Sequence, residues 1–254
     1  MIPAVDGLAA FGPATVAACL LAAYLIVGEP VVGTVLHRRF EAGLGSDPNA
    51  RIWLYQRLLV LEWGLVALVA GVVLLAPAVG WAQLGLRLPD RAPDVVALVL
   101  TVLVLAFLIG STRALRASVR RTGDTATLTA GAPQAITALV PRSPVERRWF
   151  GLVAVTAGVC EELLYRGFLL AVVVAIAPGL PDLALVALGG VVFGLAHLYQ
   201  GAGGVVATSV LGALLTLLYL GSGTLLLPML VHAAIDLRIL WIPVSVLPAD
   251  GPDR

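Results

Sequence analysis

The feature that most constrains this chain is the recurrence of apolar runs of about 18 residues or more from one end to the other. A run of that length lets an α-helix cross a hydrocarbon layer of about 30 Å, whereas membrane-barrel strands would alternate polar and apolar residues. With 60% hydrophobic residues, 12% charged residues and a mean hydropathy of +1.01, the chain lacks the polar surface of a water-soluble globule. The sequence therefore predicts an all-α fold, a polytopic integral membrane bundle.

Seven crossings are predicted, or eight if the last apolar segment is broken near Pro243. The apolar segments are 10–36, 53–81, 93–114, 149–177, 183–199, 204–220 and 224–247. The loops between them are too small to fold alone, so we expect one membrane domain. Within it, residues 1–142 supply the first transmembrane helices and their basic loops, residues 143–247 a core and residues 248–254 a short tail.

The distribution of arginine predicts the orientation. Arginines crowd the loops at 37–51 and 113–148, while the loop at 84–94 carries only two, offset by two aspartates. By the positive-inside rule the two basic loops are cytoplasmic and the N-terminus is outside. We expect a multi-pass protein of the cytoplasmic (inner) membrane of a prokaryote. A net charge of +1 gives no indication of a nucleic-acid partner.

Charged residues inside an apolar segment mark the candidate site. In CEELLYRGF, residues 160–168, Glu161 lies thirteen residues beyond Arg148, or about 20 Å along a helix that Ser143 and Glu146 are expected to cap. A carboxylate near mid-membrane costs at least about 2.5 kcal/mol, so it should face a partner or a wet cavity.

Arg166, one turn on, is the predicted partner of Glu162, and this pair alone would serve to pin helix packing. Glu161 points about 100° away and has no partner nearby in the sequence.

Two histidines in later apolar segments complete the constellation. His197 ends FGLAH, and His232 shares a helix face with Asp236 in HAAID. Amide hydrolysis needs a base for water, a group that orients the water and donors for the developing oxyanion, and this set supplies them. The same four residues, Glu161, His197, His232 and Asp236, also suit a divalent metal such as zinc, so both interpretations stay open.

EELLYR, FGLAH and HAAID match the EExxxR, FxxxH and HxxxN/D motifs of the CPBP (Abi) family, in the family's order and spacing. The chain resembles this family, which includes type II CaaX prenyl endopeptidases and bacteriocin self-immunity proteins. The resemblance implies an intramembrane endopeptidase that opens toward the cytoplasm and acts on membrane-associated protein or peptide substrates. Residues 143–247 would be its catalytic core.

The resemblance also implies roles for single residues. Glu161 would be the water-activating base, His197 would help hold the water, and His232 with residue 236 would stabilise the oxyanion. Glu162 and Arg166 would support the site, and Phe193 would pack beside it. An ionised Asp236 cannot donate as the family's asparagine does, so Asp236 must be protonated, orient His232 or bind a metal.

Two further acids in apolar segments, Glu29 and Glu62, are expected either to line a substrate path or to pair with arginines near the interface. Two other functions compete with proteolysis: a non-catalytic binding, immunity or regulatory protein, and an ion-coupled transporter. The transporter is disfavoured because matching broken helices in two halves of the chain are not evident.

Overall fold

In the computed structural model, which describes residues 5–122 and 134–242, the chain is helical and forms no strand within those ranges. The predicted all-α class is confirmed. The α-helices are α1 (Thr15–Ala23), α2 (Glu29–Gly43), α3 (Ala50–Leu75), α4 (Val95–Thr122), α6 (Gln134–Leu139), α7 (Pro144–Glu161), α8 (Leu170–Ile176), α9 (Asp182–Ala196), α10 (Gly201–Ser222) and α11 (Leu226–Leu237). The π-helices are η2 (Tyr24–Gly28) and η3 (Glu162–Leu169), and the 3₁₀ segments are η1 (Leu8–Ala14), η4 (Leu198–Gln200) and η5 (Arg238–Trp241).

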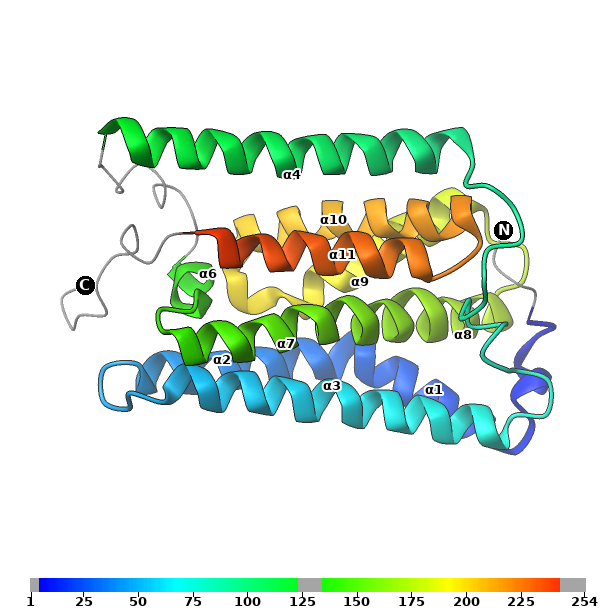
Figure 1. Ribbon diagram of the computed structural model, residues 1–254. Helices are drawn as coiled ribbons and strands as arrows, with labels where there is room; N and C mark the ends of the chain where they lie inside the picture. The colour runs from blue at the N-terminus through cyan, green and yellow to red at the C-terminus, as the bar shows by residue number, and fades with distance from the viewer. Residues whose placement is uncertain (1–4, 123–133, 243–254) are drawn as a thin grey trace.

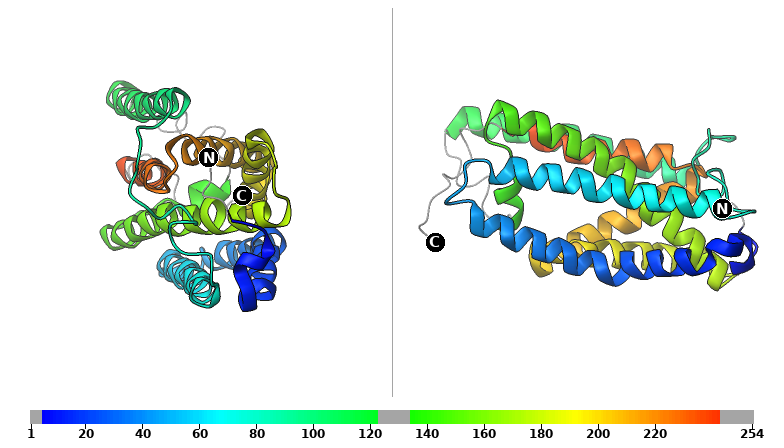
Figure 2. Two further views of the ribbon diagram at one scale, coloured as in Figure 1. Left: turned by 90° about the vertical axis from the view of Figure 1, so that its right-hand side faces the viewer. Right: turned by 90° about the horizontal axis from the view of Figure 1, so that it is seen from below.

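A continuous rod made of α7, η3 and α8 occupies the middle of the bundle. Figures 1 and 2 show it between α1, α2 and α3 on one side and α9, α10 and α11 on the other, with α4 outermost beside α10. Every residue of η3 is buried. The central segment of the motif-bearing helix is therefore enclosed by protein on both sides.

Within the described residues, four helical spans are long and apolar enough to cross a membrane: Leu8–Gly43, Ala50–Leu75, Val95–Ala114 and Leu198–Ser222. By their length and composition these spans make this a multi-pass integral membrane protein. Helices α9 and α11, with 15 and 12 residues, are shorter than the roughly 20 residues of a full crossing. The count of seven or eight crossings stays a prediction.

Several predicted boundaries differ from those observed; α4, for example, continues to Thr122, beyond the predicted end at residue 114. Helix α3 ends at Leu75 rather than near residue 81, because Ala76 precedes Pro77 and adopts an extended backbone (φ −88°, ψ 118°). The first basic loop is shorter than residues 37–51, since α2 continues to Gly43 and α3 begins at Ala50. The predicted end of the last segment near residue 247, Pro243 and the tail at 248–254 lie outside the described residues.

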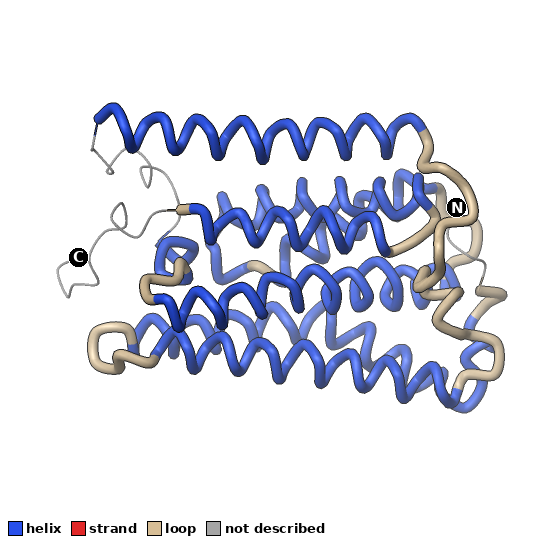
Figure 3. The backbone as a smooth tube through the Cα atoms, in the orientation of Figure 1, coloured by secondary structure: helices blue, strands red, loops and turns tan. Residues whose placement is uncertain are grey.

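Most loop residues gather at the two ends of the bundle (Figure 3). At the end where α2 finishes and α7 begins, α6 packs near α2 and η4. Arg51 Nε donates to the carbonyl of Ala138 at 2.8 Å, and Tyr55 Oη donates to the carbonyl of Leu139 at 2.6 Å. Part of the third predicted loop is thus a helix that α3 holds against the bundle end.

Candidate active site

The rod that carries the motif begins at the predicted capping box. Glu146 N–H donates to Ser143 Oγ at 3.2 Å, and Glu146 Oε2 accepts from the N–H of Ser143 at 3.2 Å, which confirms the predicted helix start. The helix is then unbroken to Glu161, where the backbone widens into the π-helix η3. Insertions of this kind are frequent at functional sites because they re-aim neighbouring side chains. The sequence periodicity did not predict this change.

Glu162 and Arg166 form the predicted ion pair in the protein interior. Arg166 Nη1 donates to Glu162 Oε1 at 2.8 Å, and neither side chain is exposed. Arg166 Nη2 also donates to the carbonyl of Gly212 on α10 at 3.2 Å, and the guanidinium lies over the Phe193 ring at 4.2 Å from its centroid. The pair thus ties the rod to both α9 and α10.

His232 on α11 makes the contact that sequence reasoning missed. Its Nδ1 lies 2.7 Å from Glu162 Oε1, the oxygen that also accepts from Arg166. Because the Glu162 carboxylate accepts there, Nδ1 carries the hydrogen and Nε2 faces the remaining acids. Nε2 lies 3.9 Å from Glu161 Oε2 and 3.7 Å from Asp236 Oδ2. Glu162 therefore fixes how the imidazole is presented to Glu161.

A glycine on α7 lets α11 come close enough for this contact. A Cβ atom added at Gly158 would lie 2.7 Å from the backbone nitrogen and 2.8 Å from the Cβ of Ala233, which follows His232. Real Cβ contacts are not that short, so a side chain at this position would push the two helices apart. Gly158 thus helps set the distance between Glu162 and His232.

His197 lies at the end of α9, on the other side of the Phe193 ring from His232. Its Nδ1 lies 2.8 Å from the carbonyl of Phe193, one turn earlier, so Nδ1–H donates there and Nε2 is left as an acceptor. The Phe193 ring packs between the two imidazoles, with its centroid 4.7 Å from that of His197 and 5.8 Å from that of His232. Phe193 therefore spaces the histidines, as expected of a residue packing beside the site.

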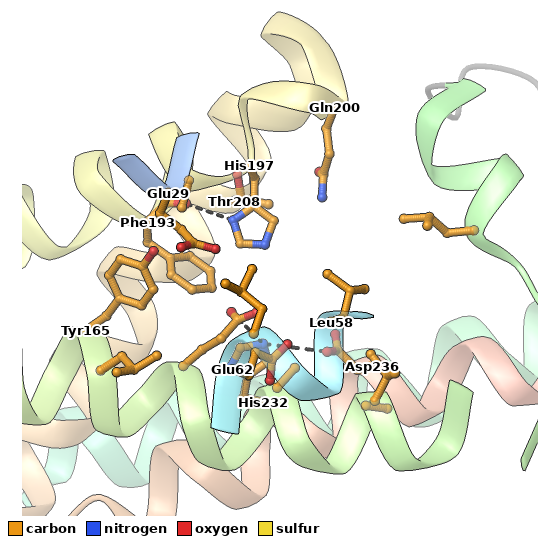
Figure 4. A pocket seen from close by; sticks show the side chains of 18 of the residues that line it. Glu29, Leu58, Glu62, Tyr165, Phe193, His197, Gln200, Thr208, His232 and Asp236 are labelled. Carbon is orange, nitrogen blue, oxygen red and sulfur yellow. Dashed lines mark hydrogen bonds and ion pairs between the residues drawn. The ribbon is translucent and has the colours of Figure 1, made fainter. Parts of the chain in front are cut away.

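These side chains surround one cavity of about 310 Å³. All four predicted catalytic residues, Glu161, His197, His232 and Asp236, line it, as does Phe193, whereas Glu162 and Arg166 support it from behind. Figure 4 shows His197, Asp236 and Glu62 converging on this space from three different elements. The cavity continues to Leu139 of α6, at the bundle end that the two basic loops share.

Glu29 and Glu62 also line the cavity, and their expected place along a substrate path stays a prediction. Each has a buried carboxylate oxygen, Oε2, with no hydrogen-bond partner among the described residues. Their segments, α2 and α3, lie far from the three motifs in the sequence. The motifs therefore could not indicate that these acids face the same space as Glu161.

Glu161, His197, His232 and Asp236 are also the candidate ligands for a metal. Among the described residues, no group of three or more His, Cys, Asp and Glu side chains is arranged to hold an ion. As placed, the four residues proposed from the sequence for zinc do not form such a group, and the metal interpretation stays a hypothesis.

Comparison with protein families gives one match. Residues 145–238, from the first turn of α7 to the start of η5, match the model described as Rce1-like, type II CAAX prenyl endopeptidase Rce1-like. The match contains all seven residues that the motifs singled out and excludes α1 to α6. Neither curated proteins nor solved structures gave a significant match.

Proposed function

We propose that this membrane protein, whose residues 145–238 match the Rce1-like model of type II CAAX prenyl endopeptidases, is an intramembrane endopeptidase whose catalytic water is activated by Glu161. Its substrates are membrane-associated proteins or peptides, either CaaX-like or peptide precursors. One observation carries the proposal: of two adjacent glutamates, Glu162 is fully buried and tied to Arg166 and His232, while the partly exposed Glu161 lines the cavity and its Oε2 has no hydrogen-bond partner among the described residues. A base needs such a free oxygen to take a proton from water.

The residues divide the hydrolysis between them. His197 Nε2 accepts a hydrogen bond from the water, Glu161 removes its other proton, and the resulting hydroxide attacks the scissile carbonyl carbon. In the imidazolium form His232 donates from both nitrogens, to Glu162 through Nδ1 and to the oxyanion through Nε2. When the tetrahedral intermediate collapses, the proton held by Glu161 passes to the leaving amine.

The arginine distribution supports a proposal for orientation. The cavity continues toward the bundle end bearing α6, where Arg38, Arg39, Arg147 and Arg148 lie. Under the positive-inside rule that end faces the cytoplasm. In this proposal the protein sits in the inner membrane of a prokaryote, its N-terminus is outside, and substrates enter the site from the cytoplasmic side.

The proposal is tested by comparing new protein N-termini in membranes of cells that express the wild type or Glu161→Gln at equal level. Asp90→Asn, which makes the same carboxylate-to-amide change at an exposed side chain near the other end of the bundle, is the control. Termini present with the wild type and Asp90→Asn but lost with Glu161→Gln support the proposal. If a wild-type phenotype persists in all three strains without such termini, the protein acts by binding rather than by cleavage.

A further inference from the structure

The charge of the cavity lining is not explained by hydrolysis alone. Four carboxylates line it, from Glu29, Glu62, Glu161 and Asp236, with two imidazoles and, among the described lining residues, no arginine or lysine. Arg166, the arginine of the EELLYR motif, already contacts Glu162, the Gly212 carbonyl and the Phe193 ring. Of these four acids the proposed mechanism uses Glu161, and the family resemblance gives Asp236 a place at the oxyanion, so Glu29 and Glu62 have no task in it.

Glu62 is the more constrained of these two acids. It lies midway along α3, its residue surface is only 9% exposed, and its Oε2 has no hydrogen-bond partner among the described residues. It also lies within electrostatic range of Glu161, Asp236 and Glu29. A buried carboxylate among three others is costly unless a cation or a hydrogen-bond donor reaches it.

Glu29 approaches from another element, at the junction of η2 and α2. It lies within electrostatic range of Glu161, and its Oε2 also has no described partner. The hydroxyl of Tyr165, which lines the same cavity, has none either. The Glu29 side chain hydrogen-bonds to Tyr24, so Glu62 is the acid whose charge is left less satisfied by the chain itself. Polar atoms from α2, α3 and η3 thus line one cavity without a hydrogen-bond partner among the described residues.

We propose that Glu62 and Glu29 form a subsite that binds a cationic side chain, lysine or arginine, of the substrate beside the scissile bond. This inference rests on the proposed endopeptidase function and adds a substrate class to it. An ammonium or guanidinium group brings several N–H donors and a positive charge, which satisfy the free carboxylate oxygens. A bound metal would be a different way to balance this charge, but the described side chains do not form a metal-binding group.

The first step of the test uses the Glu161-dependent termini described above. A subsite next to Glu161 predicts that lysine or arginine is enriched within about three residues of the cleaved bonds, since an extended chain spans about 3.3 Å per residue. Cleavage without such enrichment would overturn the cationic subsite and leave the protease function standing. Absence of Glu161-dependent termini would instead overturn the protease function, and the subsite with it.

The second step measures selectivity with purified full-length protein in lipid nanodiscs. A peptide covering the most abundant cleavage site is made with lysine, or with Nε-acetyl-lysine, at the enriched position. The wild type should cleave the lysine peptide about 10- to 100-fold faster, as expected for one charge-assisted contact. Glu62→Gln should bring this ratio close to one, while Asp90→Asn should leave it unchanged.

The ratio of the two rates is independent of the folded fraction, because both peptides meet the same preparation. Glu29→Gln, on a different element, should also bring the ratio of the two rates closer to one. It replaces Glu62→Gln if the Glu62→Gln variant yields no protein. An unchanged ratio in the glutamate variants would overturn the subsite, whatever their absolute rates.

Discussion

Glu162 accepts a hydrogen bond from His232 Nδ1 at 2.7 Å, on the same oxygen that accepts from Arg166 at 2.8 Å. One carboxylate oxygen therefore joins η3 to α11 and settles which imidazole nitrogen faces Glu161. This gives the two adjacent glutamates of the motif different surroundings, although they have the same chemistry. In the proposed mechanism Glu162 is therefore a positioning residue, and Glu161 activates the water.

The two glutamates should therefore respond differently to the same substitution. Glu161→Gln should reduce kcat/KM by about 100-fold or more, because it removes the proposed base. It should leave thermal unfolding close to that of the wild type, since Oε2 accepts no hydrogen bond from the described residues. Glu162→Gln, in contrast, should destabilise the protein by about 3–5 kcal/mol, because Arg166 loses its buried counter-charge.

Purified variants in one detergent allow both quantities to be measured side by side, unfolding by temperature and cleavage with a peptide identified from the new N-termini. The distinction between the glutamates fails if Glu161→Gln proves as unstable as Glu162→Gln. It also fails if Glu162→Gln keeps the stability of the wild type.

The close approach of α7 and α11 makes a second prediction, at Gly158. An alanine there should separate the helices at Ala233 and lengthen the bond between Glu162 and His232. We expect a stability loss of about 1–3 kcal/mol and a fall in kcat/KM of tenfold or more, since small misplacements at a catalytic site are costly.

Gly151, also on α7, is the matched control for Gly158. A Cβ there would lie 3.6 Å from Leu240 Cδ1, an ordinary contact, so Gly151→Ala should keep full activity and gain up to about 1 kcal/mol from helix propensity. Equal activities of the two alanine variants would contradict the role given to helix spacing.

Arg166 provides a third prediction because its shape matters as well as its charge. A lysine at this position keeps the charge but cannot contact Glu162, the Gly212 carbonyl and the face of Phe193 together. Arg166→Lys should lower stability by about 2 kcal/mol, whereas Arg57→Lys at an exposed position should have little effect. Thermal unfolding of both variants checks this, and equal midpoints would show that a point charge is sufficient.

Local patterns predicted much of the fold. Hydropathy located the helices, and the SPVE stretch located the start of α7 because a capping box depends only on residues three apart. The pairing of Glu162 with Arg166 was predictable for the same reason, since residues four apart on a helix are neighbours. The end of α3 was misplaced because hydropathy does not register the backbone restriction that Pro77 imposes on Ala76.

Contacts between distant segments were not predictable in this way. Glu162 and His232 are 70 residues apart, and their contact depends on how Gly158 packs against Ala233. Glu62 reaches the cavity because α3 packs against α7. No sequence motif on α3 indicates this packing. The sequence therefore indicated the candidate residues, whereas the packing shows which of their polar atoms already have hydrogen-bond partners.

Asp236 gives the last prediction, since three roles were open for it: a protonated donor, a group orienting His232, or a metal ligand. The orienting bond to His232 is made at Nδ1 by Glu162, while Asp236 Oδ2 lies 3.7 Å from Nε2, beyond hydrogen-bond distance. If Asp236 serves the oxyanion as a donor, an amide should replace it, so Asp236→Asn should keep about a third or more of wild-type kcat/KM. Asp236→Leu, which removes the donor, should lose about 100-fold. Peptide cleavage by both variants, with and without added zinc, separates the roles. An asparagine variant as inactive as the leucine variant would exclude the donor role. Recovery of cleavage on adding zinc would indicate that Asp236 is a metal ligand.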